Sequence, residues 1–260
     1  MISPSTDPIG VGWIEVMAEI GFDYVELPLA DLAALPETGF AKLAARLQRS
    51  GLGCEACNNF FPRTLRLTGA GASLDAALEY ARGALDRAGR LGARIVVFGS
   101  SGAKNVPEGF PRPAAWIQLV ALLRQLGPIA ARHGVTVAIE PISRPEANFI
   151  NLAAEGLRLA READHPNIQL LIDYYHFGLE QEEPAVIVEA GTAIRHLHFA
   201  GVEGRKFPAE PVPDHQSFFE RLKQIRYPGR CSIEAFTRDF AAEAPRALRI
   251  LKSYALEQNL

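Results

Sequence analysis

The sequence has few cysteines and no excess of basic charge. Three cysteines in 260 residues, an odd number, do not make a disulfide framework. The 27 basic and 30 acidic residues give a formal net charge of −3, which argues against a nucleic-acid partner, because such proteins normally carry a basic stripe. Cys54 and Cys57 form a C-x-x-C. In a strand this spacing places the two thiols on opposite faces, so we expect them to pack in the core.

The features of exported and membrane-spanning proteins are also missing. The segment 1–8 has neither the basic nor the apolar region of a signal peptide. No apolar run reaches about 18 residues, the length that would predict a membrane span. We therefore expect a cytoplasmic protein without a membrane partner. Hydrophobic residues make up 48% of the chain, which is enough for a large core.

Short apolar segments alternate with amphipathic segments along almost the whole chain. The apolar segments have the length of strands buried on both faces, and several of the amphipathic segments end in a glycine that can stop a helix. Strands are predicted at residues 24–27, 52–57, 94–99, 135–140, 168–173, 194–199 and 231–235. Helices are predicted at 11–20, 40–50, 73–91, 113–133, 152–163, 183–190, 217–225 and 241–257.

An eighth strand has to precede the first helix if this alternation closes into a barrel, and only residues 1–4 are available for it. A parallel α/β barrel of eight strands typically needs about 250 residues. We therefore predict that residues 1–260 form one (β/α)8 TIM-barrel domain of the α/β class, with an abbreviated first strand.

Four acidic or imidazole residues stand near the ends of four consecutive strand segments: Glu140, Asp173, His198 and Glu234. Their separations of 33, 25 and 36 residues each match a strand, a loop, a helix and a loop. The carboxyl ends of the strands meet at one face of a parallel barrel, so these side chains are expected to converge. Ionised carboxylates are costly to bury without a partner, and four converging groups therefore predict a cation.

The donor set indicates which cation this is. Carboxylate oxygens suit manganese and magnesium, and an imidazole extends the range to cobalt, zinc and iron. We predict one divalent metal ion, with Mn²⁺ first and Mg²⁺, Co²⁺ and Zn²⁺ as alternatives. A single glutamate at a strand end is as often a cap or an ion-pair partner, so it is the set of four that carries this prediction.

Three further residues are candidates for substrate binding. His176 comes three residues after Asp173, while Glu146 and Arg205 lie in loops that follow predicted strands. Each also has a purely structural interpretation, as a solvated histidine or a surface ion-pair partner. His196 shares a face with His198 but stands further from the strand end, so we expect it in the barrel interior.

With these residues in place, the chain resembles the xylose isomerase-like TIM barrels, and within them the sugar isomerases and epimerases. That group includes ketose 3-epimerases of the tagatose and psicose type, hydroxypyruvate isomerase and inosose-processing enzymes. The resemblance covers roughly residues 20–257. It is carried by a glutamate with a second one six residues later, an Asp-x-x-His, a His-x-His before an arginine, and Ser-Ile-Glu-Ala. These stand here at Glu140 and Glu146, Asp173 and His176, His196, His198 and Arg205, and Glu234.

The site and the resemblance together imply proton abstraction next to a carbonyl, with the metal stabilising an enediolate. Glu140 and Glu234 would be the acid/base pair and also metal ligands, while Asp173 and His198 would be ligands only. The resemblance implies a sugar or keto-acid as the small-molecule partner. A homodimer or homotetramer is a further expectation.

Four alternative functions stay open at this point. A metal-dependent dehydratase or isomerase of keto-inositols would use the same site. A nuclease of the endonuclease IV type would need a cluster of zinc ions, for which six histidines are a short supply. A metal-free glycoside hydrolase could use Glu140 and Glu234 as its two carboxylates. A non-catalytic binding barrel could keep the pocket without activity.

Overall fold

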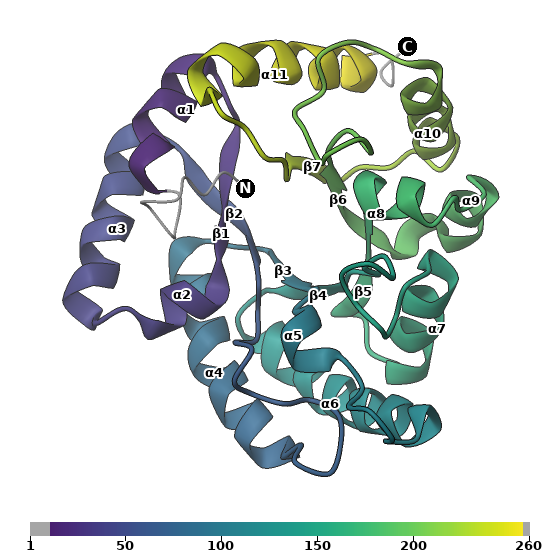
Figure 1. Ribbon diagram of the computed structural model, residues 1–260. Coiled ribbons are helices and arrows are strands. Elements are labelled where there is room, and N and C mark those ends of the chain that lie inside the picture. The colour runs from purple at the N-terminus through teal and green to yellow at the C-terminus, as the bar shows by residue number, and fades with distance from the viewer. Residues whose placement is uncertain (1–10, 257–260) are drawn as a thin grey trace.

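The computed structural model describes residues 11–256, and in them seven parallel strands form one sheet in chain order, curled into a barrel inside a ring of helices (Figure 1). This confirms the predicted TIM barrel. The seven strand segments predicted from the sequence are all strands, while the strand predicted at residues 1–4 lies outside the described residues. The strands are β1 (Tyr24–Pro28), β2 (Gly53–Asn58), β3 (Ile95–Phe98), β4 (Thr136–Ile139), β5 (Ile168–Asp173), β6 (Ile194–Phe199) and β7 (Arg230–Ile233).

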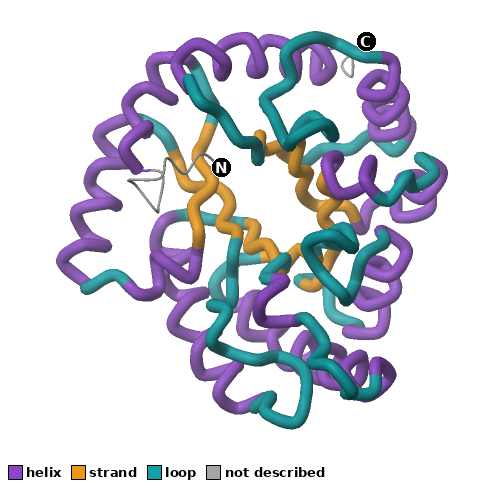
Figure 2. Tube along the Cα trace, viewed as in Figure 1, coloured by secondary structure: helices purple, strands orange, loops and turns teal. Residues whose placement is uncertain are grey.

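The helices lie outside the strands (Figure 2). Short helices after β1, β3 and β5 were not predicted, because four to six residues carry too little periodicity to be read. The α-helices are α1 (Ile14–Ile20), α2 (Leu29–Ala34), α3 (Glu37–Ser50), α4 (Leu74–Leu91), α5 (Ser101–Lys104), α6 (Arg112–Arg132), α7 (Ala153–Ala163), α8 (Tyr174–Leu179), α9 (Ala185–Ala190), α10 (Pro213–Gln224) and α11 (Phe240–Leu256). Two 3₁₀ turns are η1 (Val11–Trp13) and η2 (Gly191–Ala193).

A seam separates β1 from β7. Within residues 11–256 the sheet runs from β1 to β7 without a ladder joining the two, although α1 and α11 contact each other outside it. A cavity of about 230 Å³ lies along the seam, with Leu197 and Ile233 in its wall. Side chains bridge the seam, because Tyr24 Oη lies 2.7 Å from Ser232 Oγ. The barrel is therefore held across this gap by a polar contact between the edge strands and by the packing of α1 against α11.

Helix α6 is, in the described part of the chain, the helix that is long and apolar enough to cross a membrane by length and composition. It contacts α4, α7 and β4. Leu119, Leu123 and Leu126 on it are fully buried. Burial of one side of this helix against the strands and the neighbouring helices is consistent with its apolar composition.

The prediction that the two cysteines of the C-x-x-C lie on opposite faces of the strand is wrong. Cys54 and Cys57 are both buried, and their Sγ atoms lie 3.7 Å apart. The pairing of β1 with β2 shifts between Val25 and Glu26, so that Glu55 has no partner on β1. A bulge of one extra residue resets the alternation of the strand, which brings two thiols three residues apart onto one face.

Replacing Glu182 with glutamine is expected to stabilise the fold at alkaline pH. Its carboxylate accepts a hydrogen bond from Ala153 N, at 2.8 Å, at the start of the helix that follows the Glu140 loop. Burial raises the pKa of Glu182 from 4.5 to about 7. Between these values the folded chain keeps a proton that the unfolded chain has released, so the free energy of unfolding falls as pH rises through this window.

Glutamine keeps the hydrogen-bond acceptor without the charge. Because solvent screens part of the charge of this partly exposed side chain, we expect about 1 to 2 kcal/mol of stabilisation at pH 8. The gain should shrink toward pH 4.5 in urea unfolding curves. Glu183→Gln is the matched control, since Glu183 is exposed. Equal effects of both variants at pH 8 would contradict the explanation.

Candidate metal centre

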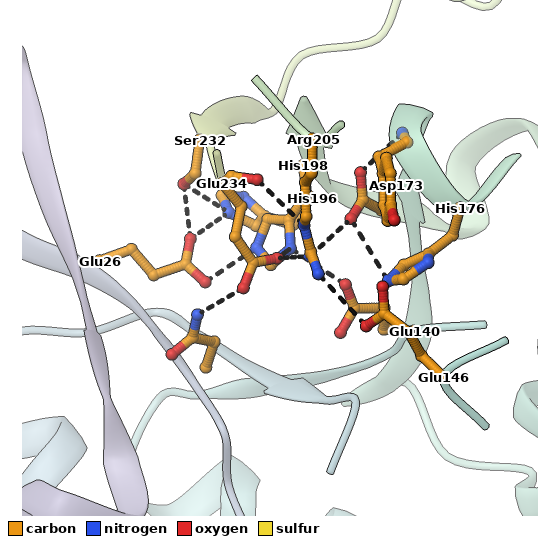
Figure 3. Close-up of polar contacts among 12 residues, drawn as sticks. Glu26, Glu140, Glu146, Asp173, His176, His196, His198, Arg205, Ser232 and Glu234 are labelled. Atoms are coloured by element: carbon orange, nitrogen blue, oxygen red, sulfur yellow. Dashed lines mark hydrogen bonds and ion pairs between the residues drawn. The ribbon is translucent and has the colours of Figure 1, made fainter. Parts of the chain in front are cut away.

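The four residues predicted as ligands come together at the mouth of the barrel. Glu140, Asp173, His198 and Glu234 each offer one ligand atom, and these atoms all lie within 4.8 Å of one another. Figure 3 shows their side chains pointing toward a common centre. His198 Nδ1 lies 3.1 Å from Glu140 Oε1 and 2.8 Å from Glu234 Oε2. Asp173 and His198 are among the most buried polar residues, with 2% and 0% exposure.

The ends of four strands fix these positions. Asp173 is the last residue of β5 and also caps α8, because its Oδ1 accepts a hydrogen bond from Tyr175 N at 2.9 Å. Glu140 follows β4, and its backbone carbonyl accepts a hydrogen bond from Lys104 Nζ at 2.7 Å. Glu234 follows β7, where its backbone N donates to Phe199 O at 3.1 Å. Lys104 is fully buried, and burial lowers its pKa to about 8.

The electrostatics of the centre show that it attracts positive charge. Burial raises the pKa of Asp173 to about 7, and the carboxylates of Glu234 and Glu140 add to this rise. Burial opposes a charge on His198, but Glu26, Glu234 and Glu140 outweigh it and hold the pKa of this imidazole well above its usual value. A divalent cation would take the place of that proton, since metal ligands must be deprotonated. The donor set of three carboxylates and one imidazole nitrogen therefore fits a divalent metal.

Arg205 lies over the same centre. Its Nη2 is 2.9 Å from Glu234 Oε2 and 3.3 Å from Asp173 Oδ2, and its Nη1 is 3.4 Å from Glu146 Oε2. Its guanidinium also stacks on Tyr175, 4.8 Å from the ring centroid. The backbone of Arg205 has φ = 51°, uncommon for a residue other than glycine. Phe236 N holds that backbone by donating to Arg205 O at 2.7 Å.

The other two predicted substrate residues also border the centre. His176 is buried on α8, with Nε2 3.7 Å from Asp173 Oδ2 and Nδ1 2.9 Å from Ser143 Oγ. Burial lowers the pKa of His176, which favours the neutral ring. Glu146 is more open, with 39% of its side chain exposed. All seven predicted site residues are thus gathered at one place.

Sequence reasoning gave Glu26 and Asn58 no specific role. Glu26 is buried at 8% exposure in β1, with its Oε1 2.8 Å from His198 Nε2. Asn58 Nδ2 donates to Glu234 Oε1 at 3.2 Å. The available signal was a lone carboxylate inside the apolar segment Tyr-Val-Glu-Leu-Pro. His196 is fully buried as predicted, with Nε2 2.9 Å from Glu26 Oε2.

Comparison with known proteins identifies the family. The model of the xylose isomerase-like TIM barrel family matches residues 14–254. The chain belongs to this family. The resemblance inferred from the site motifs is therefore confirmed.

Named relatives are epimerases and isomerases. The chain is 29% identical over 253 residues to an L-ribulose 3-epimerase of Mesorhizobium japonicum, covering 93% of this chain and 79% of that protein. It is 34% identical over 119 residues to an L-ribulose 3-epimerase of a Methylomonas species, a match that spans 45% of this chain and 41% of the relative. The crystal structure of a D-psicose 3-epimerase from Clostridium cellulolyticum superposes with a TM-score of 0.84 at 21% identity, over 94% of this chain and 93% of that one. The predicted class, an isomerase or epimerase, is confirmed by these relatives.

Proposed function

We propose that this family member is a divalent-metal-dependent epimerase or isomerase that acts on a ketose or a small hydroxy-keto compound. The observation that carries the proposal is the convergence of three carboxylates with His198, all four ligand atoms lying within 4.8 Å of one another. His198 Nδ1 faces two of these carboxylates directly, those of Glu140 and Glu234. The names of the relatives, L-ribulose and psicose 3-epimerases, support a ketose as the substrate.

In this proposal Glu140, Asp173, His198 and Glu234 hold the metal, and manganese is the ion we favour for a set rich in carboxylates. When bound, the metal supplies Lewis-acid polarisation of the substrate's carbonyl oxygen. Asp173 uses one oxygen to cap α8 and keeps the other for the centre. His198 is deep, rigid and fully buried, which suits a residue that only binds.

Glu140 and Glu234 are the proposed acid/base pair. They follow β4 and β7, so they approach the centre from two sides with β5 and β6 between them. One would remove the proton from the carbon next to the carbonyl, and the other would return a proton to the opposite face. Return to the opposite face inverts the carbon, whereas return to the neighbouring carbon gives an aldose–ketose isomer.

His176, Glu146 and Arg205 are proposed to hold the substrate's oxygen atoms. Arg205 spans Glu234, Asp173 and Glu146, so its guanidinium can move onto an oxygen of the substrate while staying near the carboxylates. His176, neutral and held by Ser143, presents a single Nε2 to a hydroxyl group. A cytoplasmic location and a homodimer or homotetramer stay predictions.

The alternatives differ in what they ask of the structure. A cluster of zinc ions is disfavoured because His133, His165 and His215 do not join either group of potential metal-ligating residues among those described. A glycoside hydrolase would use Glu140 after β4 and Glu234 after β7, but needs neither Asp173 nor His198. A keto-inositol dehydratase would use the same metal and is separated from an epimerase by its product.

Removal of the metal is expected to abolish turnover. The test incubates chelator-treated protein with ketoses, ketose phosphates, hydroxypyruvate and keto-inositols in D₂O, with and without added Mn²⁺. We expect activity only with metal, and deuterium at the inverted carbon of an epimerised ketose, because the returned proton comes from solvent. Full activity in excess chelator would sink the proposal, while loss of water from a keto-inositol would favour the dehydratase.

A further inference from the structure

Glu26 lies below the proposed metal centre and contacts the far side of one of its ligands. Its Oε1 is 2.8 Å from His198 Nε2. Its Oε2 accepts a hydrogen bond from Ser232 Oγ at 2.5 Å and lies 2.9 Å from His196 Nε2. Both carboxylate oxygens therefore have partners, and the side chain is only 3% exposed.

We propose that Glu26 is a positioning residue that sets the tautomer and orientation of His198. Its carboxylate accepts a hydrogen bond from Nε2–H, which leaves the lone pair of Nδ1 directed at the carboxylates of the mouth, among them Glu140 and Glu234. A second hydrogen bond of this kind typically fixes a metal-binding imidazole and raises its basicity. The proposal rests on the proposed function, since it assumes a metal at Nδ1.

The same residues could be interpreted differently, because Glu26, His196 and His198 also form a group able to hold an ion. The charges decide between the two positions. An ion at Nε2 would face one carboxylate, whereas an ion at Nδ1 faces Glu140, Asp173 and Glu234. An ion at Nε2 would also leave the proton of the imidazole on Nδ1. His198 could then not be a ligand in the group formed by Glu140, Asp173 and Glu234. Three negative charges outweigh one, so the ion belongs at the mouth.

The position of Glu26 is itself determined by contacts across the seam. Ser232 on β7 donates to Glu26 and lies 2.7 Å from Tyr24 Oη on β1. His196 on β6 completes the group, with its Nε2 also 3.0 Å from Ser232 Oγ. The polar network that joins the two edges of the described sheet is thus the one that holds His198.

The first test measures Mn²⁺ binding to metal-stripped protein by titration calorimetry. Glu26→Gln is expected to weaken binding about 10- to 100-fold, the usual effect of losing such a partner. Glu243→Gln is the matched control, because Glu243 on α11 is exposed and outside this network, and it should stay within about threefold of the unchanged protein. Unchanged affinity in a folded Glu26→Gln variant would overturn the positioning role. Failure of the unsubstituted protein to bind any metal would instead contradict the proposed function.

The second test needs no folded variant at Glu26. Protein with ¹⁵N-labelled histidine, loaded with diamagnetic Zn²⁺, should show one imidazole protonated at Nε2 and ligated through Nδ1. Comparison with the His198→Asn spectrum assigns these signals. Ligation through Nε2, or a proton on Nδ1 of His198 in the loaded protein, refutes the proposal.

Discussion

Replacing either Glu140 or Glu234 with glutamine should lower kcat at least about a thousandfold, because acid/base catalysis alone contributes 10²- to 10⁴-fold and each residue is also a proposed ligand. The fold should persist, since glutamine has the same shape and Glu140 keeps its backbone contact with Lys104. Turnover of the ketose identified by the substrate panel is the measurement, at saturating Mn²⁺ so that weakened metal binding is not mistaken for lost chemistry.

The two variants should also differ from each other. If the carboxylates serve opposite faces of the substrate, each variant loses epimerisation but keeps slow solvent exchange with one of the two epimers. Deuterium uptake measured separately from each epimer would therefore show opposite preferences in the two variants. Glu243→Gln on α11 is the matched control, because Glu243 is exposed and away from the site. Near-normal turnover in both Glu140→Gln and Glu234→Gln would exclude the assignment.

Local patterns were enough to predict the barrel and the convergence of the four candidate ligands. A strand buried on both faces is a short apolar run, and β5 and β6 begin and end where such runs do. A polar residue at the end of such a run is conspicuous, as Asp173 and Glu140 are. Because all strands of a parallel barrel end at one face, position along the chain was sufficient to predict that these side chains meet.

Other features depend on contacts that no local pattern encodes. The bulge at Glu55 is visible only in the pairing of β2 with β1. Because of it, the prediction that Cys54 and Cys57 lie on opposite faces was wrong. Glu26 is a lone carboxylate in an apolar segment, but its contact with His198, 172 residues away, depends on how the barrel curls. The buried Lys104 supports Glu140 from 36 residues away. Each of these residues supports the site through a partner distant in sequence.

Gly99→Ala is expected to impair the site without unfolding the barrel. Gly99 follows β3 and lies against the carboxylate of Glu140. A Cβ at this position would overlap Glu140 Oε2 and stand 3.3 Å from Glu140 Cδ and 3.5 Å from Ile142 Cδ1. The nearest conflict is with the far end of a flexible side chain, so the carboxylate can turn away at little cost to the fold. This rotation moves the carboxylate of Glu140 away from His198 Nδ1, which lies 3.1 Å from Glu140 Oε1.

A displacement of about 1 Å at a reacting group can cost about a hundredfold in rate, so kcat/KM should fall by at least that factor and Mn²⁺ affinity should fall with it. Gly83→Ala is the matched control, because a Cβ at Gly83 in α4 meets nothing within 4 Å. It should keep full activity, and both variants should melt within a few degrees of the unchanged protein. If Gly99→Ala binds Mn²⁺ and turns over substrate as well as Gly83→Ala does, the position of the Glu140 carboxylate against Gly99 is not required for metal binding or catalysis.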